Sequence, residues 1–277
     1  MNKTIATDLD GTLFYPKDKK NMISKKNLFF LQSFIDNGGK VVLISGRSMN
    51  FGIKVQKKLN RPCDIIAFNG ASMMVSNKIV ETHNVSNLEA NDLVDEVKKT
   101  FKPILTVLMT NDGAYVDLRW KSKIVRRFLE WLYKKQGVYL ENFIFDDKRY
   151  QECLKSGIIY KVLFIFGYLP KDIKRAANIN KVIRNSYSHV DSSWSGLAIE
   201  VSAKGCNKGE SLERYAQLIK AKKEDFYVVG DSGNDISMFK LFPLNSFAMN
   251  KAPHAVKKYA KYSIDRFEDL SRYIYKK

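Results

Sequence analysis

The chain has 277 residues, of which 45% are hydrophobic, and a formal net charge of +18. This length allows one large or two medium domains, and the hydrophobic content is that of an ordinary soluble protein. The longest apolar stretch, Ile158 to Leu169, contains Lys161 and is too short to cross a bilayer, and no export signal precedes the first predicted strand. We therefore expect a cytoplasmic protein.

The cysteines and histidines argue against a disulfide framework and against a zinc site. There are three of each, and they lie far apart without the spacing of metal ligands, which fits a reducing compartment. They are Cys63, Cys153, Cys206, His83, His189 and His254.

The positive charge is spread along the chain. The lysines form no dense basic run with interleaved aromatic residues; Lys17-Asp18-Lys19-Lys20 comes nearest to one. This pattern indicates solvated faces, with steering of anionic substrates as the second interpretation. We expect no nucleic-acid partner, no membrane partner and a monomer or weak homodimer.

The opening segment alternates strands with helices, as chains with a parallel sheet do. Right-handed crossovers bring the carboxyl ends of such strands to one edge of the sheet, where open α/β sheets bind ligands. Polar residues follow each strand here: Asp8 and Asp10, then Ser45, then Asn69. The expected elements are strand 4 to 8, a helix from the N-cap Ser24 to Asp36, strand Lys40 to Ile44, a helix ending near Leu59, and strand Asp64 to Phe68.

After residue 72 the pattern changes to hairpins mixed with helices, which indicates an α+β unit inserted into the first domain. Turns at Ser76-Asn77-Lys78 and Asn111-Asp112-Gly113 predict two hairpins. Ser86 and Glu89 have capping-box spacing, which predicts a helix to about Phe101. The other expected elements are strands Ile104 to Met109, Ala114 to Asp117, Ile158 to Phe166, around Val190 and Leu197 to Val201, and helices Lys121 to Lys135 and Lys171 to Ile183.

From Lys208 onward the alternation of strands and helices returns. The strand Asp225 to Val229 ends in Gly230-Asp231-Ser232-Gly233-Asn234-Asp235, so carboxylates again follow a buried strand. The remaining expected elements are helix Gly209 to Lys220, a helix after Asp235, strand Ser246 to Met249, a helix after Pro253, strand Tyr262 to Ile264 and a terminal helix.

Carboxylates, one lysine and small polar side chains make up the predicted site, without a histidine or cysteine. Such oxygen ligands suit Mg²⁺ together with a substrate phosphate. A carboxylate about 4 Å from one phosphate charge is repelled by roughly 4 kcal/mol at an effective dielectric near 20. A divalent metal and a lysine are what would offset this repulsion and allow an aspartate to attack phosphorus.

Four segments in order resemble the motifs of the haloacid dehalogenase-like hydrolases. They are Asp8-Leu9-Asp10-Gly11-Thr12, Ile44-Ser45-Gly46-Arg47, Asn207-Lys208-Gly209 and Gly230-Asp231-Ser232-Gly233-Asn234-Asp235. Together with Asn69-Gly70-Ala71 and Ala248-Met249-Asn250-Lys251-Ala252, they resemble the Cof-type phosphatases, whose large α/β cap lies between the second and third motifs. The resemblance covers essentially the whole chain.

The resemblance implies an α/β fold: a Rossmann-like core at residues 1–82 and 204–277, and an α/β cap at 83–203 that closes over the site and selects the leaving group. It implies Asp8 as nucleophile and Asp10 as general acid and base. The implied phosphate and substrate site comprises Leu9, Gly11, Thr12, Ser45, Gly46, Arg47, Lys208 and Asn234. The implied Mg²⁺ site comprises Asp8, Asp10 through its carbonyl, Asp231, and Asp235 through a water.

Several of these residues have a structural alternative. Ser45 would cap the following helix, and Asp235 would favour the dipole of its own helix. Arg47 either reaches substrate or stays solvated. His189, Asp191 and Trp194, late in the insert, are more often packing residues than specificity residues.

The predicted function is a Mg²⁺-dependent phosphatase acting on a small phosphomonoester of the sugar phosphate, pyridoxal phosphate or flavin-pathway class. A phosphomutase is the alternative within the same chemistry. A nucleic-acid or regulatory binding protein on this fold is the alternative from another class, although the carboxylates would repel a phosphate backbone.

Overall fold

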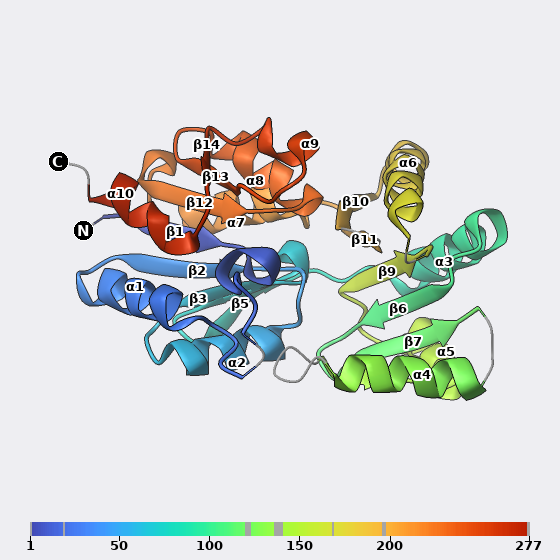
Figure 1. The fold of residues 1–277 in the computed structure, drawn as a ribbon. Helices are drawn as coiled ribbons and strands as arrows, with labels where there is room; N and C mark the ends of the chain where they lie inside the picture. The colour runs from blue at the N-terminus through green and yellow to red at the C-terminus, as the bar shows by residue number, and fades with distance from the viewer. Residues whose placement is uncertain are drawn as a thin grey trace. The chain divides into compact units, whose positions relative to one another are not determined.

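The computed structural model describes residues 2–18, 20–119, 123–135, 141–167, 169–195 and 198–275. The chain divides into two compact units. The core unit comprises Met1–Glu81 and Asn207–Lys277, and the inserted unit is Thr82–Cys206. Each unit is built on its own sheet, and Figure 1 traces both sheets and their helices.

The core unit contains an eight-stranded sheet in the order β14-β13-β12-β1-β2-β3-β4-β5. The strands from β14 to β3 are parallel, and β3 pairs with β4 antiparallel. This confirms the predicted α/β class with a mainly parallel sheet. The strands are β1 (Thr4–Thr7), β2 (Lys40–Ile44), β3 (Asp64–Ala67), β4 (Ser72–Val75), β5 (Lys78–Thr82), β12 (Phe226–Gly230), β13 (Ser246–Met249) and β14 (Tyr262–Ile264).

Helices cover the core sheet because alternate strand residues face its two sides. Ala6, Val42 and Ile66 share one hydrophobic cluster with Leu212 of α7 and Phe239 of α8. On the other side, α2 packs so closely that a Cβ on its Gly52 would lie 2.6 Å from Ile65. The helices of this unit are α1 (Lys25–Asp36), α2 (Met49–Leu59), α7 (Lys208–Leu218), α8 (Ile236–Leu241), α9 (His254–Lys257) and α10 (Ser271–Ile274).

The inserted unit has a six-stranded sheet in the order β10-β11-β9-β6-β7-β8, antiparallel except for the β7–β8 pair. Helix α3 begins with the predicted capping box of Ser86 and Glu89. The strands are β6 (Leu105–Met109), β7 (Ala114–Leu118), β8 (Phe143–Ile144), β9 (Lys161–Ile165), β10 (Val190–Ser195) and β11 (Ala198–Ala203). The helices are α3 (Asn87–Phe101), α4 (Lys123–Lys134), α5 (Asp147–Ser156) and α6 (Pro170–Ser186).

Two elements of the inserted unit were not expected from sequence, the short strand β8 and the helix α5. Helix α5 is mostly polar and buries only a short stripe of Tyr150, Cys153 and Leu154, so it offers few apolar residues from which to predict a helix. Strand β9 starts later than predicted, and Ile158 is exposed. The predicted helix start at Lys121 and Ser122 and the strand start at Leu197 lie outside the described residues.

No helix in the described part of the chain combines the length and the apolar character needed to cross a membrane.

Helix α1 fixes the loop that follows β1. Ser24 caps the helix as predicted, and its hydroxyl accepts from the backbone of Asn27 at 3.2 Å. The fully buried Asn27 side chain donates to the carbonyls of Leu13 (2.8 Å) and Tyr15 (3.1 Å). One amide therefore ties the chain after the first motif to the helix that packs beside it.

Replacing Asn27 with Ala should lower the free energy of unfolding by about 2–3 kcal/mol, because two carbonyls lose their donor. Urea denaturation followed by circular dichroism measures the change. Asn37→Ala is the matched control, since Asn37 is exposed and donates only to the Ser33 carbonyl. Equal losses in both variants would contradict this role for Asn27.

Candidate active site

The polar residues that follow neighbouring strands meet at one edge of the core sheet. Strand β1 lies between β2 and β12, and all three run parallel. Asp8 follows β1, Ser45 follows β2 and Asp231 follows β12, so their side chains emerge at adjacent strand ends. The edge predicted from sequence is therefore formed by segments from both parts of the core unit.

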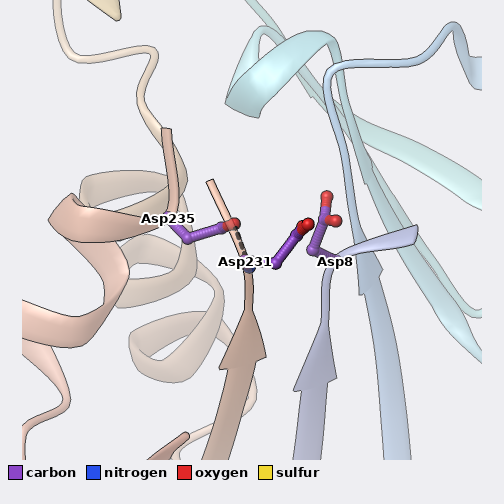
Figure 2. Close-up of side chains that lie close together, drawn as sticks. All are labelled: Asp8, Asp231 and Asp235. Atoms are coloured by element: carbon purple, nitrogen blue, oxygen red, sulfur yellow. Dashed lines mark hydrogen bonds between the residues drawn. The ribbon is translucent and has the colours of Figure 1, made fainter. Parts of the chain in front are cut away.

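Three carboxylates converge at this edge. Asp8, Asp231 and Asp235 each offer an oxygen, and these oxygens lie within 4.8 Å of one another. Asp8 and Asp231 extend from the ends of two adjacent strands, and Asp235 reaches in from the turn before α8 (Figure 2). We call these three residues the acid cluster.

Lys208 is buried between two members of the acid cluster. Its Nζ lies 2.6 Å from Oδ1 of Asp8 and 2.7 Å from Oδ1 of Asp235, and its side chain is 0% exposed. Asn207 caps α7 by accepting from the backbone of Glu210, so Lys208 is the first residue of that helix, as the motif predicted. Because it is buried here, Lys208 belongs to this site and is not one of the lysines that face solvent.

Asp235 organises the loop after β12. Its Oδ2 accepts from the backbone N–H groups of Asp231 and Ser232, both at 2.9 Å, while its Oδ1 accepts from Lys208. Both oxygens are thus engaged within the protein. Asp235 holds Asp231 and Lys208 in place, which is more than the helix-dipole role of a first-turn acid.

Burial and mutual repulsion change the acidity of the cluster. Burial raises the pKa of Asp8 well above its ordinary value, and Asp235 and Asp231 add to this while Lys208 opposes it. Burial and the charge of Asp235 raise the pKa of Asp231 to about 6. Burial acts to lower the pKa of Lys208, but Asp235 and Asp8 outweigh it, so the pKa is raised and the ammonium form is favoured.

Asp10 is not a member of the acid cluster, and its carboxylate pairs with Arg47 instead. The guanidinium donates from Nε to Oδ2 at 2.7 Å and from Nη2 to Oδ1 at 2.8 Å, and it lies 4.8 Å from the ring centre of Phe51. Burial of the Asp10 carboxyl acts to raise its pKa, but Arg47 outweighs this and holds the pKa below its ordinary value. Arg47 therefore contacts a predicted catalytic residue.

The remaining predicted residues line the same edge. Thr12 donates to Oδ1 of Asp231 at 3.3 Å, and Asn234 donates to Oδ1 of Asn69 at 3.3 Å. The Ser45 hydroxyl accepts from the backbone N–H of Arg47 at 3.2 Å, across Gly46. Helix α2 is capped by Ser48, so the alternative that Ser45 caps it is wrong.

Gly11 is required by both its conformation and its surroundings. Its φ is +81°, and a Cβ there would lie 2.2 Å from Oδ2 of Asp231. A side chain would therefore be strained and would also displace a member of the acid cluster. The turn Leu9–Leu13 brings its backbone close to the carboxylates only because residue 11 is glycine.

The acid cluster fits a hard divalent cation. The buried Lys208 contacts two of the three carboxylates, so the cluster carries excess negative charge, and the pKa of Asp231 is raised by its burial and by the charge of Asp235. Oxygen donors in this number suit Mg²⁺ better than softer metals.

The late-insert residues have contacts within their own unit. His189 packs edge-on against Tyr187, and Asp191 accepts from the backbone of Gly205. Conversely, sequence reasoning gave no role to Lys251, whose Nζ lies 4.0 Å from Oδ2 of Asp231. The signal was available, because Lys251 follows the predicted strand Ser246 to Met249 and so belongs at the same sheet edge.

Replacing Asp231 with Asn should stabilise the metal-free protein at high pH. The folded state binds the Asp231 proton about two pKa units more tightly than a free aspartate, so ionisation above pH 6 costs the folded state about 2–3 kcal/mol. The variant should gain that amount at pH 8 and lose the gain as the pH falls through 6 towards 4. Urea denaturation in EDTA at several pH values measures this, and a pH-independent difference would contradict it.

Comparison with known proteins places the chain in a family. It matches the haloacid dehalogenase-like hydrolases over residues 5–271. YwtE and YcsE of Bacillus subtilis, both named 5-amino-6-(5-phospho-D-ribitylamino)uracil phosphatase, are 26% and 25% identical over 86% and 95% of this chain and 85% and 90% of their own. The structure of the subclass IIB sugar phosphatase BT4131 has the same fold, with a TM-score of 0.74, 18% identity and 98% of each chain covered. The chain therefore belongs to the haloacid dehalogenase-like hydrolases and is an enzyme of their phosphatase type.

Proposed function

We propose that the chain is a Mg²⁺-dependent phosphatase that hydrolyses a small phosphorylated metabolite through an aspartyl-phosphate on Asp8. The observation that carries the proposal is Lys208, buried between Asp8 and Asp235 beside Asp231. An ammonium in that position opposes the effect of burial on Asp8, favours its nucleophilic carboxylate form and offers positive charge to the phosphoryl oxygens.

In the first half-reaction, a carboxylate oxygen of Asp8 attacks phosphorus in line with the leaving alcohol. The Asp8–phosphorus bond forms while the bond to the alcohol oxygen breaks, and protonated Asp10 gives that oxygen its proton. Ser45, Lys208 and the N–H groups of the turn Leu9–Leu13 would bind the phosphoryl oxygens. Arg47 would orient Asp10 through its two hydrogen bonds.

In the second half-reaction, Asp10 accepts a proton from water, whose oxygen attacks phosphorus. The Asp8–phosphorus bond breaks, inorganic phosphate leaves, and the proton stays on Asp10 for the next turnover. Arg47 keeps Asp10 in its carboxylate form, so Asp10 begins this step as a base, and its two hydrogen bonds to Arg47 would have to weaken while Asp10 carries the proton.

The metal site we propose uses Asp8, Asp231 and the backbone carbonyl of Asp10. Asp235 would stand behind it, because both of its oxygens already accept hydrogen bonds from the protein. When bound, Mg²⁺ neutralises part of the charge on the phosphoryl group and on the carboxylates around it.

The substrate class we propose is a phosphorylated metabolite with a small hydroxylated leaving group. Two relatives bear the name of a ribitylamino-uracil phosphate phosphatase, and a protein of the same fold is titled a sugar phosphatase. We also propose that the inserted unit selects the leaving group, as a cap domain at residues 83–203, and that the enzyme works in the cytoplasm.

Changing Asp8 to Asn should lower kcat by at least ~10³-fold, because the amide is not a nucleophile towards phosphorus. Phosphate release from a panel of phosphorylated metabolites, with Mg²⁺ and with EDTA, measures the loss. Asp36→Asn is the matched control: it makes the same charge change at an exposed ion pair with Arg61 and should keep activity within about twofold.

Substantial turnover by the Asp8 variant would contradict the covalent mechanism. Release that persists at full rate in EDTA would contradict the metal requirement. Transfer of the phosphoryl group to a second sugar hydroxyl, with a bisphosphate needed for turnover, would identify a phosphomutase instead.

A further inference from the structure

A second group of positive charges lies at the edge of the acid cluster. Lys251 follows β13, and its Nζ is 4.0 Å from Oδ2 of Asp231 and 4.0 Å from the ring centre of Tyr15. The guanidinium of Arg266 lies 5.4 Å from the same ring centre. We call Tyr15, Lys251 and Arg266 the basic rim.

Tyr15 is a fixed platform for these two cations. Its backbone N–H donates to the carbonyl of Thr12 at 3.1 Å, and its own carbonyl accepts from the buried Asn27. The negative face of a tyrosine ring attracts cations without neutralising them, so both charges remain available to a ligand. The loop after the first motif thus holds two cations beside the site.

The charges of the basic rim lack matching carboxylates. Within the described residues, Asp231 at 4.0 Å is the one carboxylate in ion-pair range of Lys251, and Arg266 has none. Asp231 is committed to the metal under the proposed function, and a divalent cation there would cancel its attraction for Lys251. An anionic group of the substrate would then neutralise the positive charges of Lys251 and Arg266.

We propose that Lys251 and Arg266, held on Tyr15, bind a second anionic group of the substrate. The substrate is then a phosphomonoester that also carries a carboxylate or a second phosphate. This inference rests on the proposed function, since it takes the acid cluster as the phosphoryl site.

The second anion must lie within a few bonds of the hydrolysed phosphate. Lys251 contacts Asp231, and the oxygens of Asp231 and Asp8 lie within 4.8 Å of each other. The span from the attacked phosphorus to the basic rim is therefore short. A three-carbon phosphate with a terminal carboxylate has a suitable length. A nucleic-acid backbone would instead bring further phosphates against the carboxylates of the acid cluster.

The test compares two probes that differ in one group, 3-phosphoglycerate and glycerol 3-phosphate. Calorimetric binding with Mg²⁺ in the Asp8→Asn background removes turnover from the measurement. We expect 3-phosphoglycerate to bind at least about tenfold more tightly, and Lys251→Met to erase this preference by weakening 3-phosphoglycerate alone. A second pair with a short span, glycerol 2,3-bisphosphate and glycerol 3-phosphate, tells whether a phosphate serves as well as a carboxylate.

Lys258→Met is the matched control. Lys258 is exposed and lies over the ring of Tyr259 at 5.1 Å, so its loss changes the net charge equally outside the basic rim. This variant should keep the preference, and Lys251→Arg should restore most of it. If Lys258→Met weakens 3-phosphoglycerate as much as Lys251→Met does, the effect is general attraction and the proposal is wrong.

Two other outcomes would overturn the inference. Equal binding of the paired probes to the Asp8→Asn protein would exclude a second anion site. An equal loss for both probes in Lys251→Met would mean that Lys251 contacts the transferred phosphoryl group itself. Failure of the proposed function looks different, because the otherwise unaltered enzyme would then release no phosphate from any probe while the binding preference remained.

Discussion

The buried contact of Lys208 with Asp8 and Asp235 is the interaction on which the rest of the site depends. A fully buried ammonium is tolerated only next to carboxylates, and two buried carboxylates are tolerated only next to a cation. The contact joins residues 200 positions apart in the sequence, so it holds together the two segments of the core unit as well as the acid cluster. Stability and chemistry are therefore linked in this contact, and loss of the Lys208 charge would leave two buried carboxylates without a cation beside them.

The parallel sheet explains why so few elements are needed to build the site. Because β1, β2, β12 and β13 run in one direction, each places the residue after its last pair at the same edge. Loops of a few residues then bring Asp8, Ser45, Asp231 and Lys251 together. Asp235 and Gly11 make the final adjustments, the first by accepting two backbone N–H groups and the second by leaving room for Asp231.

Sequence reasoning predicted the sheet, a hairpin in each unit and the residues of the acid cluster, because strand ends, turns and motifs are local signals. The capping of α1 by Ser24 and the strand Ser246 to Met249 were predicted to the residue. The pairing of Arg47 with Asp10 and the place of Lys251 over Tyr15 were not, since side-chain partners distant in sequence leave no local pattern. Helix α5 was missed because its apolar stripe has only three residues.

The position of β1 between β2 and β12 has a consequence for synthesis of the chain on the ribosome. The first strand made cannot complete its pairing until the segment after Asn207 has emerged, and the inserted unit is finished before that. Domains generally fold as units during translation, so the inserted unit has all its strands while the core still lacks β12 to β14. The edge that carries the acid cluster is accordingly among the last parts of the molecule to form, and a truncated chain would carry Asp8 without the lysine that contacts it.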